Sequence, residues 1–341
     1  MKFVNLHHHS TFSFGDGFGT PAQHVARAAE LGYTAIALTE HGNVSSHFQL
    51  EKSALKAGVK PIFGLEAYCG PVEENARQQF KNHLTILAEN LDGYRGLNRI
   101  VTQSYLDYYH HPTVSGRSLS DNKSGLITLS GCSGSLLACT LLGGKGIPEP
   151  TSRSEKVQYF SNAMEVAAKF QRAFGKSYFL EVQHFHELEK TMYINMAYAR
   201  IGRELGIPLV VTGDVHYPNP DEGEMQAVLH AVHRGHHSVD DAMRKWNYEV
   251  PMTLPESDDA LLNRLLLTGL SFEEAFDAIE TSSRIAERCN VTLPKAERLE
   301  YPISKEDHEP WTKSLRIGLR SWTSSWKSLI NPNSSGVFSG P

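Results

Sequence analysis

Short apolar runs rich in β-forming residues recur seven times along the first two thirds of the chain, and segments with helical spacing separate most of them. The runs cover residues 3–7, 34–39, 60–66, 84–88, 125–130, 177–182 and 208–212, and the helical segments cover 21–31, 45–57, 94–106, 154–174 and 188–205. Alternating strands and helices are typical of parallel βαβ units. We therefore predict an α/β fold, and the sevenfold repetition favours a closed or nearly closed barrel over an open sheet.

After Tyr217 the pattern changes to helical segments alone, at residues 221–233, 257–267 and 271–288. We expect one domain over residues 1–295, with a barrel over about 1–220 and a helical extension over about 221–295. Residues 296–341 are interpreted as a linker and an amphipathic helix from about Ser304, which carries three of the four tryptophans. This helix packs on its own domain, has lost its partner because the chain is an N-terminal fragment, or lies on a membrane surface.

Composition limits the classes of protein to consider. With 40% hydrophobic and 21% charged residues, no apolar run of about 18 residues and no signal peptide, the chain is expected to be cytoplasmic, with no membrane partner. Its four cysteines form no C-x-x-C pair, which argues against a disulfide framework or a zinc finger. The net charge of -5 means that the chain as a whole repels polyanions, so any contact with nucleic acid must be local or supplied by another domain.

Residues that can bind metals follow the ends of five of the runs. They are His7, His9 and Asp16 after the first run, Glu40 and His41 after the second, Glu66 at the end of the third, Cys132 after the fifth, and Asp214 and His216 after the seventh. Loops after parallel strands gather at one face of a barrel. Imidazole, carboxylate and thiolate are the donors of zinc, manganese or iron sites. So many donors exceed the needs of one ion, and we expect two or three divalent ions.

Each of these residues has a simpler interpretation when taken alone. A single loop histidine is usually only hydrogen-bonded, and Asp16 before Gly17 is typical of a turn. Turns, however, have no reason to place such donors after one strand following another. Closely spaced metals suit phosphoester hydrolysis, with a metal-bound hydroxide as the nucleophile, and the sequence indicates no separate protein base.

Other polar residues are harder to place. His83 begins the fourth run instead of ending one, so spacing alone leaves its role undecided. The sixth run is followed by polar residues that could line the same face of the barrel and support the metal ligands: Glu181, Gln183 and His184. A helix and its exit carry four histidines that we expect to be exposed: His230, His233, His236 and His237. The glycine-rich residues 143–146 lack the spacing of a phosphate-binding loop and are interpreted as a turn.

Taken together, these motifs resemble the polymerase and histidinol phosphatase (PHP) domain that begins the α subunit of bacterial DNA polymerase III. The matching stretches are residues 6–10, 16–17, 39–43, 60–68, 83–85, 130–132, 212–217 and 285–291, so the resemblance covers roughly residues 1–295. It implies a distorted (βα)7 barrel and nine metal positions: His7, His9, Asp16, His41, Glu66, His83, Cys132, Asp214 and His216. One departure is Glu40, where the family usually has Asp, which affects only the local loop.

The resemblance also implies a function. Where the family's metal set is intact, it implies a trinuclear site with metal-dependent 3′–5′ exonuclease activity that proofreads DNA. The expected partners are a DNA 3′ end and the remainder of the replicative polymerase or a replisome subunit. The chain has no Asp-x-Asp pair for polymerase magnesium ions, so no polymerase site is expected in it. Residues 296–341 are then the start of a missing polymerase region or a truncated tail, and the chain is a fragment, a truncated product or part of a split polymerase. Two alternatives remain open: a free-standing phosphatase of the histidinol phosphatase type, and a non-catalytic scaffold stabilised by metal.

Overall fold

The computed structural model describes residues 2–233, 235, 238, 240 and 250–295. The described residues up to Leu293 belong to one compact unit. The helix predicted from Ser304, together with His236 and His237, lies outside the described residues. Within the described part, no helix is both long enough and apolar enough to cross a lipid bilayer.

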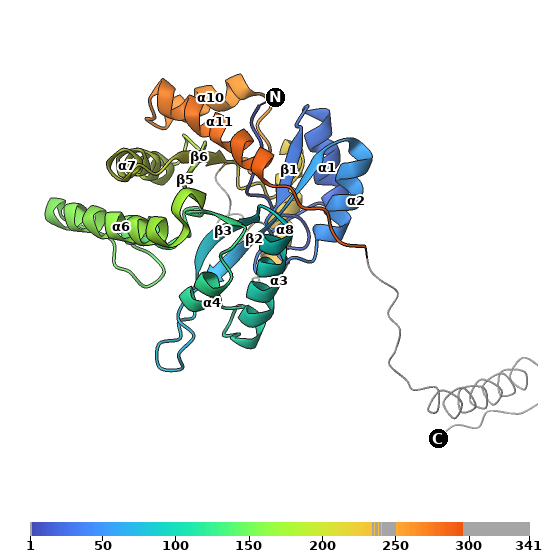
Figure 1. Cartoon of the computed structure of the whole chain (residues 1–341). Helices are drawn as coiled ribbons and strands as arrows, with labels where there is room; N and C mark the ends of the chain where they lie inside the picture. The colour runs from blue at the N-terminus through green and yellow to red at the C-terminus, as the bar shows by residue number, and fades with distance from the viewer. Residues whose placement is uncertain (1, 234, 236–237, 239, 241–249, 296–341) are drawn as a thin grey trace, which may run out of the picture. The chain divides into compact units, whose positions relative to one another are not determined.

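Six strands form one curled sheet in chain order, and helices surround it (Figure 1). The strands are β1 (Ala35–Leu38), β2 (Lys60–Cys69), β3 (Asn82–Ala88), β4 (Leu126–Leu129), β5 (Tyr178–Gln183) and β6 (Leu209–Thr212). The helices are α1 (Pro21–Glu30), α2 (His47–Ala57), α3 (Leu91–Leu106), α4 (Gly116–Asp121), α5 (Leu136–Leu142), α6 (Arg153–Phe174), α7 (Glu189–Leu205), α8 (Gly223–His233), α10 (Asp258–Leu267) and α11 (Phe272–Arg288), with 3-10 turns at Gly175–Ser177 and Pro220–Glu222. The predicted α/β class and helical C-terminal part are confirmed.

Local sequence explains where several helices begin and end. Capping boxes start α1 at Thr20, α6 at Ser152 and α11 at Ser271, where the cap hydroxyl accepts from a backbone N–H and the glutamine or glutamate three residues later bonds back. Helices α2 and α7 end at Gly58 and Gly206, whose φ values of 71° and 67° are left-handed and favour glycine.

The first predicted strand is an extended segment with isolated pairing instead of a regular strand. On one side, the backbone N–H of Ala37 donates to the carbonyl oxygen of Asn5 at 3.2 Å. On the other side, the N–H of His9 donates to the carbonyl oxygen of Val215 at 2.8 Å. Residues 5–9 therefore lie between β1 and the chain that follows β6, and they bridge the two edges of the curled sheet.

The prediction of parallel βαβ units throughout was wrong at β3. This strand runs antiparallel to both β2 and β4, whereas β1–β2, β4–β5 and β5–β6 are parallel pairs. The reason lies in the connection: residues 70–81 between β2 and β3 contain no helix, and the crossover to a parallel neighbour is usually made by a helix. The first residues of β3 therefore lie at the same end of the sheet as the last residues of β2 and β4.

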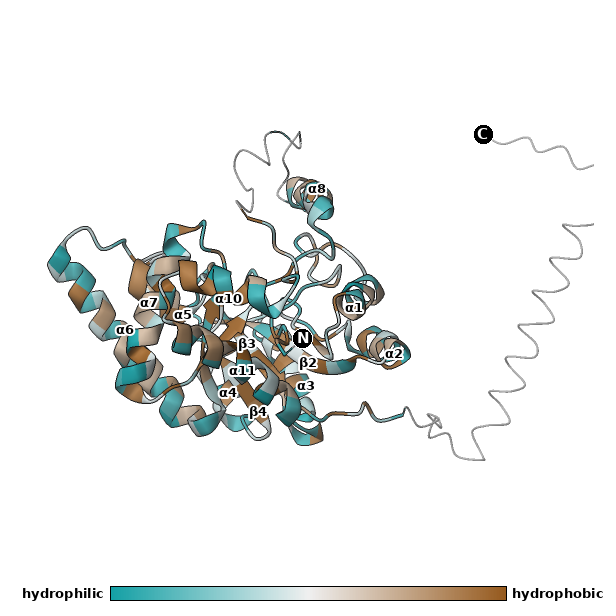
Figure 2. Cartoon of the chain, turned by 90° about the horizontal axis from the view of Figure 1, so that it is seen from above, coloured by the Kyte–Doolittle hydropathy of each residue, from teal (hydrophilic) through white to brown (hydrophobic). Residues whose placement is uncertain are grey.

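Side chains that point inward from the strands form two layers. At one end, Ile62, Leu87 and Phe179 pack together and are closed off by Ile285 of α11. The polar layer lies toward the other end of the same strands and consists of Glu66, Thr85 and Glu181. Each is two or four residues from the apolar residue of its strand, so both point to the same face, as the two-residue period of a strand requires. The outward-facing residues pack against the helices, and Figure 2 shows hydrophobic residues concentrated where helices meet strands.

Close packing of α3 on the start of β4 gives a stability prediction. A Cβ added to Gly93 would lie 1.7 Å from the carbonyl oxygen of Gly125, a backbone atom that cannot move aside cheaply. Gly93→Ala is expected to lower the free energy of unfolding by about 3 kcal/mol. In the control Gly116→Ala, the added Cβ meets nothing within 4 Å, so the change should stay below about 1 kcal/mol. Urea unfolding of both variants is the measurement, and equal midpoints would contradict this packing.

Candidate metal centre

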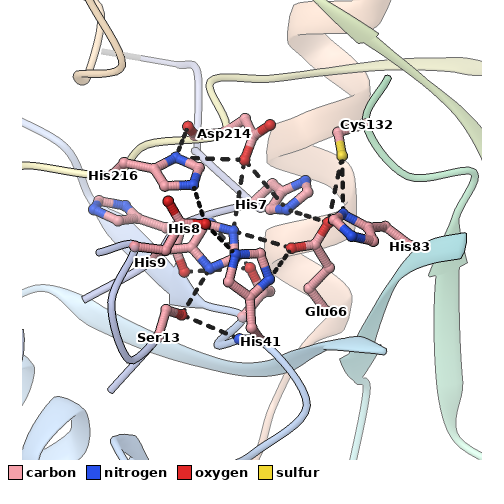
Figure 3. Close-up of polar contacts among 12 residues, drawn as sticks. His7, His8, His9, Ser13, His41, Glu66, His83, Cys132, Asp214 and His216 are labelled. Atoms are coloured by element: carbon pink, nitrogen blue, oxygen red, sulfur yellow. Dashed lines mark hydrogen bonds and ion pairs between the residues drawn. The ribbon is translucent and has the colours of Figure 1, made fainter. Parts of the chain in front are cut away.

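A fully buried carboxylate, Glu66 of β2, stands at the centre of the polar end of the sheet (Figure 3). Its Oε1 lies 2.8 Å from Nδ1 of His83, 3.4 Å from Nε2 of His7 and 3.4 Å from Sγ of Cys132. Its Oε2 lies 2.6 Å from Nδ1 of His41 and 3.3 Å from Nε2 of His9. One side chain thus touches five of the other predicted donors.

The extended segment 5–9 supplies the two deepest imidazoles. Because alternate residues of an extended chain face the same side, His7 and His9 both point to the cluster, and their rings are 5.1 Å apart. His8 faces the other way, with Nε2 2.6 Å from Nδ1 of His24. Nε2 of His7 and Nε2 of His9 each lie 3.5 Å from Oδ1 of Asp214.

Asp16 and three imidazoles form the adjoining part of the cluster. Oδ2 of Asp16 lies 2.8 Å from Nε2 of His41 and 3.5 Å from Nε2 of His216. On its other oxygen, Asp16 contacts His230 of α8, which is buried. The prediction that His230 is exposed was therefore wrong, because α8 packs its inner face over the loop that carries Asp16.

His83 and Cys132 complete the cluster on its opposite side. Nδ1 of His83 lies 3.4 Å from Sγ of Cys132, and both touch Glu66. His83 reaches this position because β3 is reversed, so its beginning meets the ends of the parallel strands. All nine predicted donors therefore lie together at one end of the sheet.

Surrounding residues fix the orientation of the deep imidazoles. Nδ1 of His7 donates to the carboxylate of Glu181 at 2.6 Å. Oγ of Ser13 donates its proton to Glu40, so Nδ1 of His9, 2.9 Å away, is the donor to Ser13. Glu181 also accepts from Thr85 and Thr212, at 2.9 and 2.6 Å. With the proton held on Nδ1, the Nε2 lone pair of each ring faces the cluster, which is the arrangement found around metal-binding histidines.

Two further supports act on the loops. Gln183 donates to Oδ2 of Asp214 at 3.1 Å, and Asp214 itself has a left-handed φ of 45°, which is uncommon for a residue with a side chain and concentrates at functional sites. Glu40 accepts from the hydroxyls of Ser10 and Ser13, both at 2.6 Å, so it holds the loop after the first segment instead of joining the cluster. His184, predicted alongside Gln183, packs against Phe185 with ring centroids 4.6 Å apart.

Opposite charges determine the electrostatics of the cluster. Burial alone would raise the pKa of Glu66, but the imidazoles of His83, His7 and His41 outweigh it and hold that pKa well below its usual value. Burial lowers the pKa of His7, yet the carboxylates around it raise the pKa well above its usual value. Burial and the nearby carboxylates together raise the pKa of the Cys132 thiol. Carboxylates and imidazoles therefore attract cations here, whether protons or metal ions.

The donor atoms group into three overlapping triads within the described part of the chain. They are His9, His41 and His216; His7, His9 and Glu66; and Glu66, His83 and Cys132, with the donor atoms of each triad within 4.8 Å of one another. Two buried ring nitrogens in them, Nε2 of His7 and Nε2 of His9, have no hydrogen-bond partner among the described residues. Buried polar atoms are seldom left unpaired, so this donor set fits divalent metal ions.

Sequence reasoning missed two of the residues that support the cluster. Ser13 lies within a loop and carries no signal beyond a turn-forming residue type, although it contacts His9 and Glu40. His230 lies 214 positions from Asp16, and only the placement of α8 brings them together.

The support given by Ser13 can be measured. Ser13→Ala removes the acceptor for Nδ1 of His9 and is expected to weaken binding of zinc or manganese about 10- to 100-fold, because ring orientation and tautomer are no longer fixed. Ser46→Ala is the matched control, since Ser46 is also buried but its hydroxyl has no partner among the described residues. Titration of both metal-free variants with either ion is the test. Equal affinities in the two variants would show that Ser13 does not support the site.

Comparison with known proteins places this geometry in a family. Residues 5–185 match the PHP domain. The α subunit of DNA polymerase III from Treponema pallidum is 31% identical over 316 residues, which are 91% of this chain and 25% of that protein. The same subunit from Borreliella burgdorferi is 28% identical over 314 residues, 89% of this chain and 25% of that protein.

The chain thus spans about a quarter of the length of the curated relatives that it matches. Among solved structures, histidinol phosphate phosphatase from Lactococcus lactis, with zinc, L-histidinol and phosphate, aligns over 71% of this chain and 94% of its own. The identity is 14% and the TM-score 0.35, a likeness too slight to support an argument. The match to residues 5–185 covers more than half of the 341 residues, and the chain therefore belongs to the PHP domain family.

Proposed function

We propose that this chain is a metal-dependent phosphoesterase that binds two or three divalent ions through the nine clustered donors. The observation that carries the proposal is the sharing of His9 and Glu66 between overlapping triads, since shared donors are what closely spaced ions require. The donor set suits zinc, manganese and iron alike. When bound, such ions lower the pKa of water toward neutrality and stabilise negative charge on phosphate oxygens.

The buried and the partly exposed donors have different roles in this proposal. The side chains of His7 and His9 are fully buried and fixed by Glu181 and Ser13, so they position the ions. The side chains of His83 and Asp16 are 21% and 22% exposed, so the cluster is open to substrate at these two residues.

A cavity adjoins the cluster and offers space for part of a substrate. It has a volume of about 520 Å³, reaches Asp214 and Gln183, and is walled by the apolar side chains of Phe185, Leu188 and Met252. Pockets of a few hundred cubic ångströms with an apolar wall and a few polar groups are typical of small-molecule and nucleotide sites.

The substrate that we propose is the 3′ end of a DNA strand, with 3′–5′ exonucleolytic cleavage as the reaction. The relatives in spirochaetes are α subunits of DNA polymerase III, and a polymerase presents a primer 3′ end that needs proofreading. The partner that delivers this end is the remainder of a replicative polymerase or a replisome subunit.

The experiment uses 5′-labelled single-stranded DNA with manganese or zinc. The chain is expected to shorten the DNA from its 3′ end, and chelation should stop the reaction. His9→Ala and Asp214→Ala should lower the rate at least about 100-fold, because both contribute donors to the cluster. His186→Ala is the control, since His186 is a partly exposed loop histidine paired with Glu187.

Three results would contradict the exonuclease. Equal activity in His9→Ala, Asp214→Ala and wild type would identify a contaminating nuclease. Rapid turnover of nitrophenyl phosphate with intact oligonucleotide would favour the small-molecule phosphatase. A melting temperature that falls on chelation, with no ester hydrolysis, would favour the metal-stabilised scaffold.

A further inference from the structure

Exposed aromatic side chains gather on two loops beside the metal centre. Phe80, on the loop from β2 to β3, is 59% exposed; Tyr108 and Tyr109, on the loop after α3, are 54% and 36% exposed. Large apolar groups that face water together commonly mark a binding surface. We call Arg77, Phe80, Tyr108, Tyr109 and His111 the aromatic–basic surface; Lys81, next to Phe80, is buried and is not part of it.

Basic groups are interleaved with these rings. Nζ of Lys81 lies 5.3 Å and the guanidinium of Arg77 lies 6.0 Å from the centre of the Tyr109 ring. These cation–π contacts hold the two loops against each other. The loop from β2 to β3 also carries Glu73 and Glu74, so its two basic residues give it no net positive charge. The contribution of Arg77 and Lys81 to this surface is therefore their contact with the Tyr109 ring, not the net charge of the loop.

The aromatic–basic surface is continuous with the metal centre. The backbone of Val114 bonds to both Tyr68, at 2.8 Å, and Gly70, at 3.1 Å, so the loop after α3 runs alongside the end of β2. This pairing places the ring of His111 4.6 Å from that of Tyr68. The Tyr68 ring in turn lies 5.4 Å from His83 and 5.7 Å from His41.

The glycine-rich turn at residues 143–146 adds a cation at the junction. Gly144 pairs with Ile147 across the turn, and Nζ of Lys145 donates to the carbonyl oxygen of Lys81. A Cβ added to Gly134 would lie 3.1 Å from Nζ of Lys145 and 3.2 Å from Nδ1 of His83, so the ammonium group stands beside the metal cluster.

Basic side chains surround His111. Burial lowers its pKa first, and His83, Lys81, His110 and Lys145 lower it further. Lys81 and Lys145 supply ammonium groups, whereas burial lowers the pKa of His83. The ammonium group of Lys145 and the guanidinium group of Arg77 offer a polyanion a local contact on a chain of net charge -5.

We propose that the aromatic–basic surface binds single-stranded DNA and leads its 3′ end to the metal centre. Unpaired bases stack on Phe80, Tyr108 and Tyr109, while Arg77 and Lys145 pair with backbone phosphates. Binding of this kind tolerates any sequence, because every base has a π-face. A duplex offers no free base faces to these rings, so the surface selects unpaired strands. The direction of the strand rests on the proposed exonuclease; the binding itself does not.

The test measures binding without cleavage. Fluorescence anisotropy of a labelled oligo-dT of about 20 nucleotides is followed in EDTA, so that hydrolysis cannot occur. The double variant Phe80→Ala/Tyr109→Ala is expected to bind at least about tenfold more weakly than wild type. Tyr109→Phe should bind like wild type because it keeps the ring. Phe48→Ala, at a 70% exposed phenylalanine on α2, is the matched control and should also bind like wild type.

Specific outcomes would overturn the proposal. They are undetectable binding by wild type, equal binding by the double variant and wild type, and equal competition by a blunt duplex. A separate assay tests the phosphoesterase activity independently of DNA binding. It measures hydrolysis of bis(p-nitrophenyl) phosphate by the wild-type chain with manganese, a reaction that needs no bound DNA strand. Its absence would refute the proposed phosphoesterase while leaving the binding result to decide on the aromatic–basic surface.

Discussion

The buried carboxylate of Glu66 is the feature on which the rest of the site depends. Removing a carboxylate from water costs several kcal/mol unless opposite charges surround it, and here four imidazoles from three segments do so. The same imidazoles crowd one another, since the rings of His9 and His41 stack 4.1 Å apart. Divalent ions between them would satisfy both the carboxylate and the unpaired ring nitrogens. Folding and metal binding are therefore linked in this proposal.

The topology of the sheet makes this convergence possible. Parallel strands bring Glu66 and Asp214 to one end, and the extended segment 5–9 adds two histidines on one side of its backbone. The reversal of β3 then adds His83 from the beginning of a strand. Omitting a crossover helix between β2 and β3 also leaves a loop, which carries Arg77 and Phe80 beside the mouth of the cluster.

Much of the fold could be predicted because local signals sufficed. Apolar runs and helical spacing predicted the regular strands and most helices to within a few residues. Donors placed directly after strands, such as His41, needed no knowledge of distant contacts. His83 could not be placed by spacing, since its position depends on the direction of β3. The missing helical segment between residues 66 and 84 was the signal for that reversal. His230 and Ser13 had no comparable signal, because tertiary packing alone brings them to Asp16 and His9.

The metal content of the chain tests the central claim most directly. Wild-type protein, purified without added metal and then equilibrated with manganese or zinc, can be compared with Glu66→Ala by elemental analysis. We expect two or three tightly bound ions per wild-type chain and the loss of more than one of them in the variant, because Glu66 belongs to two of the three triads. One ion or none in wild type, or an unchanged number in the variant, would contradict it.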